Sequence, residues 1–300
     1  MFRAASPPIA FAAGTLGIAL FSMMDAVMKG MTIAMGVYNA MLWRFGAVFV
    51  LTGIVYLVRR KAWPGREALR FHMIRGVVTV VMALLFFWGL ARVPMAQAIA
   101  LTYIAPLLAL FLAAILLKER ISRGVIGASL IACAGVGVIL TGQAQARMGE
   151  EALLGALAII GSAVCYSYNI ILMRQQALVA DPAEISFFQS VTVGSLLLLA
   201  APWLAAVPPV AQAGPILLSA VLATVSLFLL SWAYARGEAS YLAPTEYTSF
   251  VWAALLGWLI FGEHVSPYTL AGAALIVGAC LIAARRKPDL VAHDAEAALP

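Results

Sequence analysis

Ten apolar stretches, each close to the length of a membrane-spanning helix, divide the chain from one end to the other. A helix that crosses a bilayer needs about 20 mostly apolar residues, and charged or turn-rich breaks separate the stretches. Soluble domains carry about a quarter charged residues, whereas this chain is 64% hydrophobic and 11% charged. We therefore expect an all-α integral membrane protein whose spans lie near residues 9–31, 37–58, 73–91, 95–117, 124–141, 153–173, 184–206, 213–235, 239–261 and 268–284.

Basic residues are distributed unevenly among the breaks. With the N-terminus on the inner side, only Lys29, Arg92 and Arg147 fall in outer breaks, while the other loop Lys and Arg residues collect inside, Arg75 among them. Cytoplasmic loops carry an excess of Lys and Arg, so both termini are expected to be cytoplasmic and the protein to lie in the inner (plasma) membrane. The net charge of +6 then reflects orientation, and no nucleic-acid partner is expected.

Residues 91–122 and 235–266 are two versions of one segment. Each opens on a short turn, continues as an apolar helix and ends with a glutamate, Glu119 in the first and Glu263 in the second. Recurrence in register over this length indicates a duplicated chain. The prediction is a first five-helix repeat over 1–147, a second over 148–284, and a disordered cytoplasmic tail over 285–300.

The odd number of spans in each repeat determines the relative orientation of the two. Five crossings leave the chain on the opposite side, so the second repeat enters the membrane in the inverse sense. Inverted repeats recur in secondary transporters, with the substrate site near the midplane between them. The predicted fold is thus ten transmembrane helices in two inverted five-helix repeats around a central cavity. Channels and structural bundles are also built by duplication, so the architecture favours transport without proving it.

The turn after the fourth span carries a family resemblance. Leu-Lys-Glu-Arg-Ile-Ser at 117–122, followed by Ile-Gly-Ala-Ser-Leu-Ile, is similar to the signature that closes each half of EamA-type proteins in the drug/metabolite transporter superfamily. The second half repeats it as Phe-Gly-Glu-His-Val-Ser at 261–266. Pro106 also resembles the family, although its counterpart is Phe250. The resemblance implies ten spans in two inverted halves and export of small metabolites, commonly amino acids, with the YddG-type amino-acid exporters as the nearest type.

Ionisable side chains inside the spans are few, and in the first repeat they are Asp25 and Arg44. Such groups are costly at membrane depth and normally face the bundle interior or a water-filled cavity. At 1.5 Å per residue both lie about 10 Å below the outer surface, where they would form an ion pair, with Lys29 as a competing partner of Asp25. Two readings stay open. The charges either lock the first two spans together, or form an outer gate in which Arg44 contacts a substrate carboxylate.

Polar residues of the second repeat occupy matching positions at offsets of 144 to 145 residues. The pairs are Asp25 with Asn169, Lys29 with Arg174, Arg44 with Gln189, and Thr102 with Glu246. Because the repeats are inverted, Asn169, Gln189 and Glu246 are expected toward the cytoplasmic side, as an inner gate. Glu246 is either a structural carboxyl or a group that binds a proton or a substrate ammonium during transport.

Aromatic side chains crowd into the middle spans. Tyr103 and Tyr247 occupy matching mid-span positions, next to Thr102 and Glu246. A pocket with apolar walls and a few convergent polar groups suits a small amphipathic ligand. The expected cavity residues are Tyr103, Thr102, Tyr247, Glu246, Trp232, Trp88 and Tyr166. Packing within the core is the competing explanation for each aromatic taken alone.

Together these features predict an exporter of small amphipathic metabolites, in particular neutral or aromatic amino acids, working by alternating access. A sugar-phosphate or nucleotide-sugar exchanger of the same superfamily is an alternative, but it would need several deep cations to hold phosphate, and only Arg44 is available. The rivals from other classes are an intramembrane enzyme and a purely structural membrane protein.

No enzyme, cofactor or metal is expected. The histidines, His72, His264 and His293, are assigned to loops or the tail, and no metal-binding motif occurs. The expected partners are a small-molecule substrate and the lipid bilayer. The fifth and tenth spans are rich in small residues that permit close helix approach, so they either brace the fold or join two copies, and the protein is expected to be a monomer or homodimer.

Overall fold

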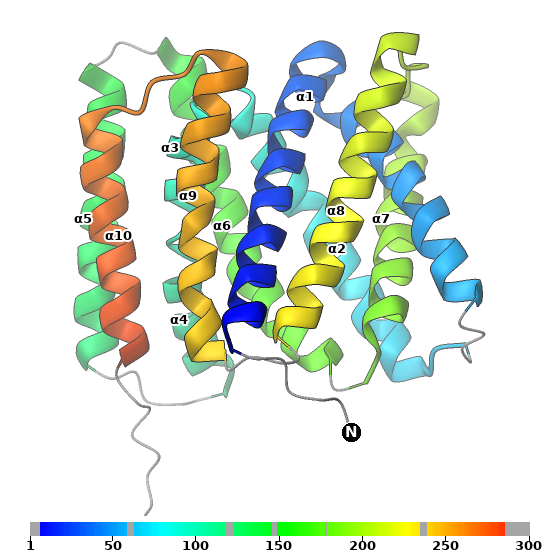
Figure 1. The fold of residues 1–300 in the computed structure, drawn as a ribbon, viewed down its shortest axis with the longest axis horizontal. Helices are drawn as coiled ribbons and strands as arrows, with labels where there is room; N and C mark the ends of the chain where they lie inside the picture. The colour runs from blue at the N-terminus through cyan, green and yellow to red at the C-terminus, as the bar shows by residue number, and fades with distance from the viewer. Residues whose placement is uncertain are drawn as a thin grey trace, which may run out of the picture.

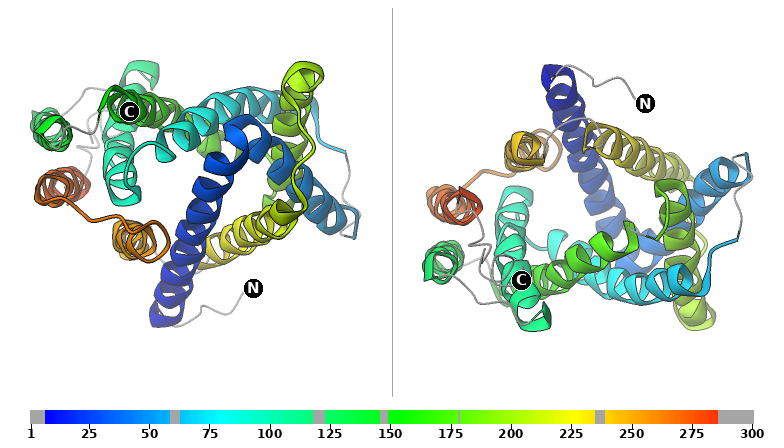
Figure 2. Two further views of the ribbon diagram at one scale, coloured as in Figure 1. Left: turned by 90° about the horizontal axis from the view of Figure 1, so that it is seen from above. Right: turned by 90° about the horizontal axis from the view of Figure 1, so that it is seen from below.

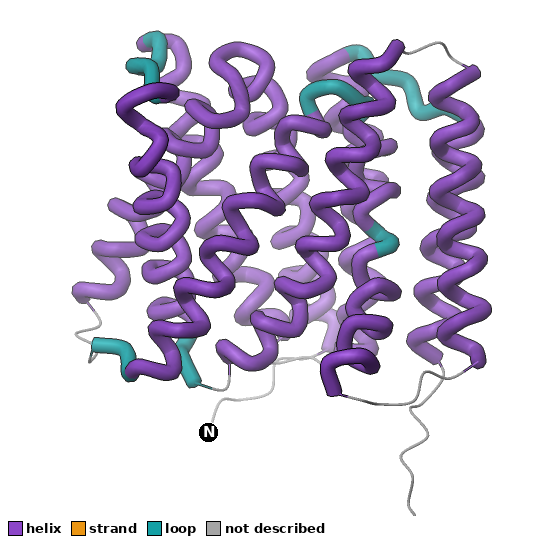
Figure 3. The backbone as a smooth tube through the Cα atoms, turned by 180° about the vertical axis from the view of Figure 1, so that it is seen from behind, coloured by secondary structure: helices purple, strands orange, loops and turns teal. Residues whose placement is uncertain are grey.

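The structure is a computed structural model that describes residues 7–58, 63–117, 123–145, 149–177, 179–234 and 239–285. Regular structure in this part is entirely helical, as the purple tube of Figure 3 shows. Five stretches of it are long and apolar enough to cross a membrane, and three shorter helices are also apolar. The all-α prediction is therefore confirmed for the described residues. The elements are α1 (Pro7–Val58), α2 (Arg66–Leu90), α3 (Met95–Thr102), α4 (Ala105–Leu117), α5 (Arg123–Gln145), α6 (Gly149–Ala177), α7 (Pro182–Leu204), the 3-10 helix η1 (Val210–Gln212), α8 (Ala213–Tyr234), α9 (Ala239–Phe261) and α10 (Pro267–Arg285).

The first two expected spans form the two arms of α1, which breaks at Gly36. The backbone there has φ 80 and ψ 154, a conformation that only glycine adopts readily. In Figure 1 the dark blue arm rises from the N-terminus, and the lighter blue arm descends beside α7. We call the end of the bundle that holds this break and the loop after α9 the upper end, and the end near the N-terminus the lower end.

The fourth expected span is not one helix, which corrects the prediction. It consists of α3 and α4, separated at Tyr103 and Ile104, just before Pro106. Proline has no N–H to bond the carbonyl of Thr102, and its ring clashes with that carbonyl, so the helix breaks one turn earlier. Its counterpart α9 has Phe250 at the matching position and is continuous from Ala239 to Phe261.

Helices distant in the sequence pack in pairs: α1 against α8, α2 against α6, and α5 against α10. Figure 2 shows α5 and α10 together at one edge of the bundle in both views. These two helices approach closely at Gly135 and Gly272, because a Cβ at Gly135 would lie 2.8 Å from the carbonyl oxygen of Gly272. The small residues expected to permit close approach thus serve a contact within the chain.

Some predictions concern residues outside the described part. The glutamate Glu119 and the tail beyond Arg285 belong to this group, as does the side chain of Arg174. Two other positions need correction. His72 and Arg75 were assigned to a cytoplasmic loop, but α2 begins at Arg66 and includes both. The polar first turns extend the helix below its apolar stretch.

Candidate functional site

An ion pair joins α1 to the loop after α9 at the upper end of the bundle. The Lys29 side chain is buried, donates to the carbonyl oxygen of Val93 at 2.7 Å, and forms an ion pair with Glu263. The other carboxylate oxygen of Glu263 accepts from the backbone N–H of Met95 at 2.7 Å. We call Lys29, Val93, Met95 and Glu263 the upper tie. It joins α1 and the turn before α3 to the loop after α9.

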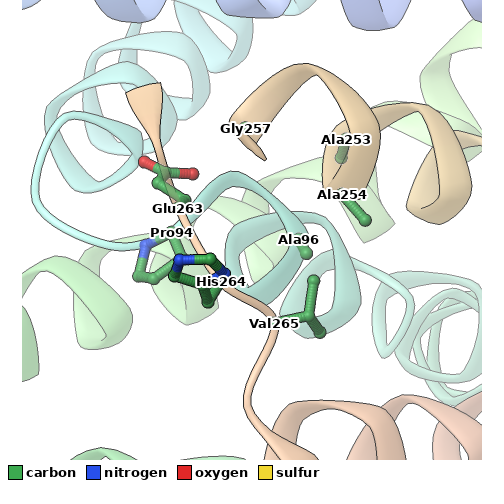
Figure 4. Close-up of a pocket in the computed structure, with 8 residues that line it drawn as sticks. All are labelled: Pro94, Ala96, Ala253, Ala254, Gly257, Glu263, His264 and Val265. Carbon is green, nitrogen blue, oxygen red and sulfur yellow. The ribbon is translucent and has the colours of Figure 1, made fainter. Parts of the chain in front are cut away.

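The loop after α9 is shaped so that Glu263 turns back toward α3. Gly262 has a positive φ of 67, the left-handed conformation that commonly ends a helix. The Glu263 N–H then donates to the carbonyl oxygen of Gly257 at 3.0 Å. Figure 4 shows Glu263 and His264 on this loop beside Pro94, where they line a narrow pocket.

Asp25 and Arg44 are buried, but no ion pair joins them within the described chain. Asp25 is 3% exposed and Arg44 7% exposed. The guanidinium faces the sulfurs of Met24 and Met41, each at 3.8 Å, and lies 4.5 Å from the ring centroid of Phe45. Thioether sulfur is a weak acceptor. The expected partner Lys29 is engaged in the upper tie instead.

Two atoms of this pair lack hydrogen-bond partners among the described residues, namely Oδ1 of Asp25 and Nε of Arg44. Nearly all buried polar groups in proteins are satisfied, so an exception calls for an explanation. A ligand with a carboxylate for Arg44 and an ammonium for Asp25 would satisfy both through charge-assisted hydrogen bonds. Within the described part of the chain, no group of three His, Cys, Asp or Glu residues is placed to hold a metal ion.

Tyr103 and Tyr247 meet at the helix break, with ring centroids 5.4 Å apart in an edge-to-face arrangement. The Tyr103 hydroxyl lies 2.7 Å from that of Ser249 and 3.1 Å from the carbonyl oxygen of Tyr247, and it accepts from the Phe250 N–H at 2.9 Å. Thr102 bonds the carbonyl oxygen of Ile99 in its own helix at 2.7 Å. Tyr103 therefore fastens α3 to α9, and its hydroxyl is fully occupied.

A second polar group lies nearer the lower end. Glu246 is exposed and accepts from the Tyr234 hydroxyl at 2.6 Å. Tyr166, which is 37% exposed, interacts electrostatically with both Glu246 and Arg75. These side chains come from α9, α8, α6 and α2. Four helices thus contribute side chains to this polar group.

The other two residues of the expected inner gate lie against α2. Asn169 accepts from Arg75 Nε at 3.1 Å, and Gln189 donates to Thr79 at 2.7 Å. Glu246 hydrogen-bonds Tyr234 instead, so these three residues are not joined in one hydrogen-bonded cluster. Sequence reasoning missed Arg75, although its position only two residues into the third apolar stretch was a signal.

The two expected cavity tryptophans lie far from each other in the fold. Trp88 is near the upper end of α2, where the Arg92 guanidinium stacks 3.7 Å from its ring centroid. Trp232 packs in a small cluster with Ala10, Ala233 and Leu242, which come from α1, α8 and α9. The structure therefore does not bring these two residues into one pocket with Tyr103.

Comparison of the sequence with known proteins identifies its family. The model of the EamA-like transporter family matches the chain twice, over residues 8–141 and 153–285. A riboflavin transporter of Rhizobium johnstonii is 31% identical over 281 residues, which cover 90% of this chain and 89% of the relative. The pseudopaline exporter of Pseudomonas aeruginosa is 27% identical over 271 residues, covering 89% and 93%.

More distant similarity agrees. An S-adenosylmethionine uptake transporter of Rickettsia bellii is 24% identical over 241 residues, 79% of each chain. One protein of known crystal structure superposes with a TM-score of 0.61 at 25% identity, covering 94% of this chain and 100% of the other. This multi-pass membrane protein belongs to the EamA-like transporter family of the drug/metabolite transporter superfamily, whose relatives above carry small metabolites.

Proposed function

We propose that the chain is an inner-membrane exporter of small amphipathic metabolites, in particular neutral and aromatic amino acids, and that it works by alternating access. The observation that carries this proposal is the difference between its two ends. Lys29 and Glu263 form an ion pair at the upper end, whereas Glu246 and Tyr166, nearer the lower end, are exposed. With the lower end taken as cytoplasmic, this arrangement corresponds to an inward-facing state.

Alternating access needs two bodies that rock against each other, and we assign these to residues 1–147 and 148–284 as inverted repeats. The packing supports this assignment. If the chain is an inverted duplication, the first arm of α1 corresponds to α6, and α2 corresponds to α8. The contacts α1 with α8 and α2 with α6 are then the same contact made twice. The upper tie crosses between the two repeats.

The substrate class follows from the buried charges of α1. The Arg44 guanidinium and the Asp25 carboxyl group lie in a region lined by thioethers and aromatic rings, and each has an unsatisfied atom. An α-amino carboxylate has both complementary groups on one carbon, and an apolar or aromatic side chain would match the surrounding Met24, Met41 and Phe45. We propose that Arg44 binds the substrate carboxylate and Asp25 the ammonium.

A flux assay with matched variants tests this proposal. Proteoliposomes containing the full chain are loaded with labelled phenylalanine, and its release is compared for wild type, Arg44→Gln and Arg70→Gln. Arg70 is exposed on the first turns of α2 and serves as the control for loss of one cation. We expect Arg44→Gln to reduce release at least about tenfold, the equivalent of about 1.4 kcal/mol of lost charge-assisted bonding, and Arg70→Gln to leave it near wild type. Equal release by all three proteins would refute the role of Arg44.

Flat aromatic metabolites form a second candidate substrate class, favoured by one observation. The riboflavin transporter of Rhizobium johnstonii is 31% identical to this chain, and the rings of Tyr103 and Tyr247 meet in the interior. The same liposomes loaded with riboflavin separate the two classes. Release of riboflavin that is insensitive to Arg44→Gln, with no release of phenylalanine, would support the flat-aromatic class and exclude the amino-acid proposal.

A further inference from the structure

A buried histidine with partners on both ring nitrogens lies near the lower end of α2. His72 is 1% exposed, and its ring stacks on Phe188 with centroids 5.0 Å apart. Its Nε2 lies 3.1 Å from Oε1 of Glu184 on α7, and its Nδ1 lies 2.6 Å from Nε2 of Gln176 on α6. Gln176 also contacts Arg75, whose Nη1 is 2.5 Å from Oε1 of Gln176. We call these four residues the lower relay.

The chemistry of the relay fixes the direction of each hydrogen bond. A guanidinium can only donate, so the Gln176 atom that faces Arg75 must be the amide oxygen. The amide nitrogen of Gln176 then faces His72 and donates to Nδ1, which must be unprotonated. The proton of the neutral ring is therefore on Nε2, where it is donated to the Glu184 carboxylate. The arrangement thus holds His72 in one neutral tautomer.

A second proton on His72 is incompatible with this arrangement. It would bind at Nδ1 and turn this atom into a donor, facing the donor amide of Gln176. If Gln176 rotates to present its oxygen to His72, its NH₂ group faces Arg75, which also only donates. The bond between Arg75 and Gln176 must then break. Arg75 keeps its bond to Asn169 Oδ1 at 3.1 Å, and no covalent bond is made or lost except the new N–H.

We propose that His72 is a proton-binding site whose occupancy controls the contact between Arg75 and Gln176, and thereby links α2 to α6 in a proton-dependent way. Its coupling to transport depends on the function proposed above, whereas proton binding itself does not. Histidine is the side chain whose unperturbed charge change lies near neutral pH. After the bond to Gln176 breaks, Arg75 still interacts electrostatically with Tyr166, and Tyr166 also interacts with Glu246. Protonation of His72 can therefore affect the polar group that contains Glu246.

The charged groups around His72 are few in the described part of the chain. From α7 it meets Glu184, and Asp181 lies just before this residue as the cap of the same helix. From α6, Gln176 contacts His72 directly, and Asn169 and Tyr166 interact with Arg75. Around Phe188, α1 contributes the phenol of Tyr56, and the loop before α2 contributes Trp63. No residue of α3 is charged. A proton on His72 would therefore be balanced by Glu184 and opposed by Arg75.

Nitrogen-15 NMR of the full-length protein, labelled at histidine and held in lipid nanodiscs, tests proton binding without any substrate. The chain contains three histidines, and the His72→Gln variant assigns the resonances of His72, with His293→Gln as the control for loss of a histidine. We expect the Nε2–H tautomer at alkaline pH and conversion to imidazolium on acidification. A ring that stays neutral from pH 8 to 5, or the opposite tautomer at pH 8, would overturn the proposal.

A second variant keeps the test decisive if His72→Gln does not fold. In Gln176→Glu the carboxylate can accept from both the His72 Nδ1–H and Arg75, which favours the imidazolium. We expect half of His72 to be protonated at a proton concentration at least about tenfold lower than in wild type. Gln189→Glu, which makes the same change where the partner is Thr79, should leave the His72 resonances unchanged. Identical titration of wild type and Gln176→Glu would contradict the relay.

Phenylalanine release from proteoliposomes then shows whether the site is coupled to transport. We expect both variants to release at the alkaline plateau rate of wild type at every pH. In His72→Gln no proton binds at position 72, and in Gln176→Glu the carboxylate keeps its contact with Arg75 when His72 is protonated. A wild-type pH profile in both variants would refute the coupling. Absence of release by every protein would refute amino-acid export instead, while the NMR result still decides whether His72 binds a proton.

Discussion

The two ends of the bundle are held by different kinds of interaction. At the upper end, the ion pair between Lys29 and Glu263 joins residues 234 positions apart in the chain, and Lys29 is 3% exposed. Near the lower end, Glu246 is exposed and accepts a hydrogen bond from the phenol of Tyr234. A buried ion pair contributes little net stability, but loss of one partner is costly because the other charge is left uncompensated. We therefore expect loss of one partner to cost more in the upper tie than at Glu246.

Loss of one charge from the upper tie should have the largest effect on stability. We expect Glu263→Gln, which leaves the buried ammonium of Lys29 unpaired, to lower the free energy of unfolding in detergent by about 3–5 kcal/mol. The double variant Lys29→Gln with Glu263→Gln should lose less than the sum of the single losses. Strict additivity in a denaturant titration would show that the pair is not coupled.

The same change should also open the upper end. Ala254 lines the pocket beside Glu263, so a cysteine there reports access when the native cysteines are replaced by serine. Labelling by a membrane-impermeant maleimide should be faster in Glu263→Gln than in the parent. Unchanged labelling would mean that the ion pair does not keep this end closed.

Loss of the Tyr103 hydroxyl, between the two ends, should have an intermediate effect on the free energy of unfolding. Tyr103→Phe removes the hydroxyl that accepts from the Phe250 N–H and bonds Ser249, and we expect a loss of about 1–3 kcal/mol from the hydrogen bonds lost between α3 and α9. Thr141→Val is a suitable control, since the exposed Thr141 hydroxyl donates to the carbonyl oxygen of Val138 in the same helix. Equal unfolding free energies for both variants would show that Tyr103 does not fasten α3 to α9.

The smallest stability effect is expected at the lower end. Because Glu246 is exposed, we expect Glu246→Gln to change the free energy of unfolding by no more than about 0.5 kcal/mol. Tyr234→Phe, which removes the 2.6 Å bond, is the matched variant with the carboxyl retained. A loss of stability as large as that of Glu263→Gln would erase the distinction between the two ends.

Short-range pattern predicted most of the helices, although the fourth stretch is two helices and α2 begins at Arg66. Apolar stretches predicted the helices, because lipid allows the backbone no other way to satisfy its hydrogen bonds than helices or closed barrels, and the breaks fell close to the observed ends. Gly36 interrupts α1 where two spans were expected. The repeat drew attention to Glu263, although its partner was not foreseen.

The candidate site was harder to predict, since partners depend on which helices meet. The spacing of four residues predicts Lys29 as a partner of Asp25, but Lys29 pairs with Glu263 from the other half of the chain. His72 was given a loop position, but α2 begins earlier and directs this residue to Glu184 and Gln176. Sequence spacing predicts which residues are neighbours on one helix, but it does not predict contacts between helices.

The sequence by itself determined that this chain is a duplicated, helical membrane protein. The length of an apolar segment decides whether it can cross the bilayer as a helix, and the repeat is visible as similarity between two segments of the sequence. Only the tertiary structure decided which buried charges are paired. In low-dielectric surroundings a charged side chain takes whichever partner the packing brings within a few ångströms. Here the packing gives Lys29 a carboxylate and leaves Asp25 and Arg44 each with an unsatisfied atom.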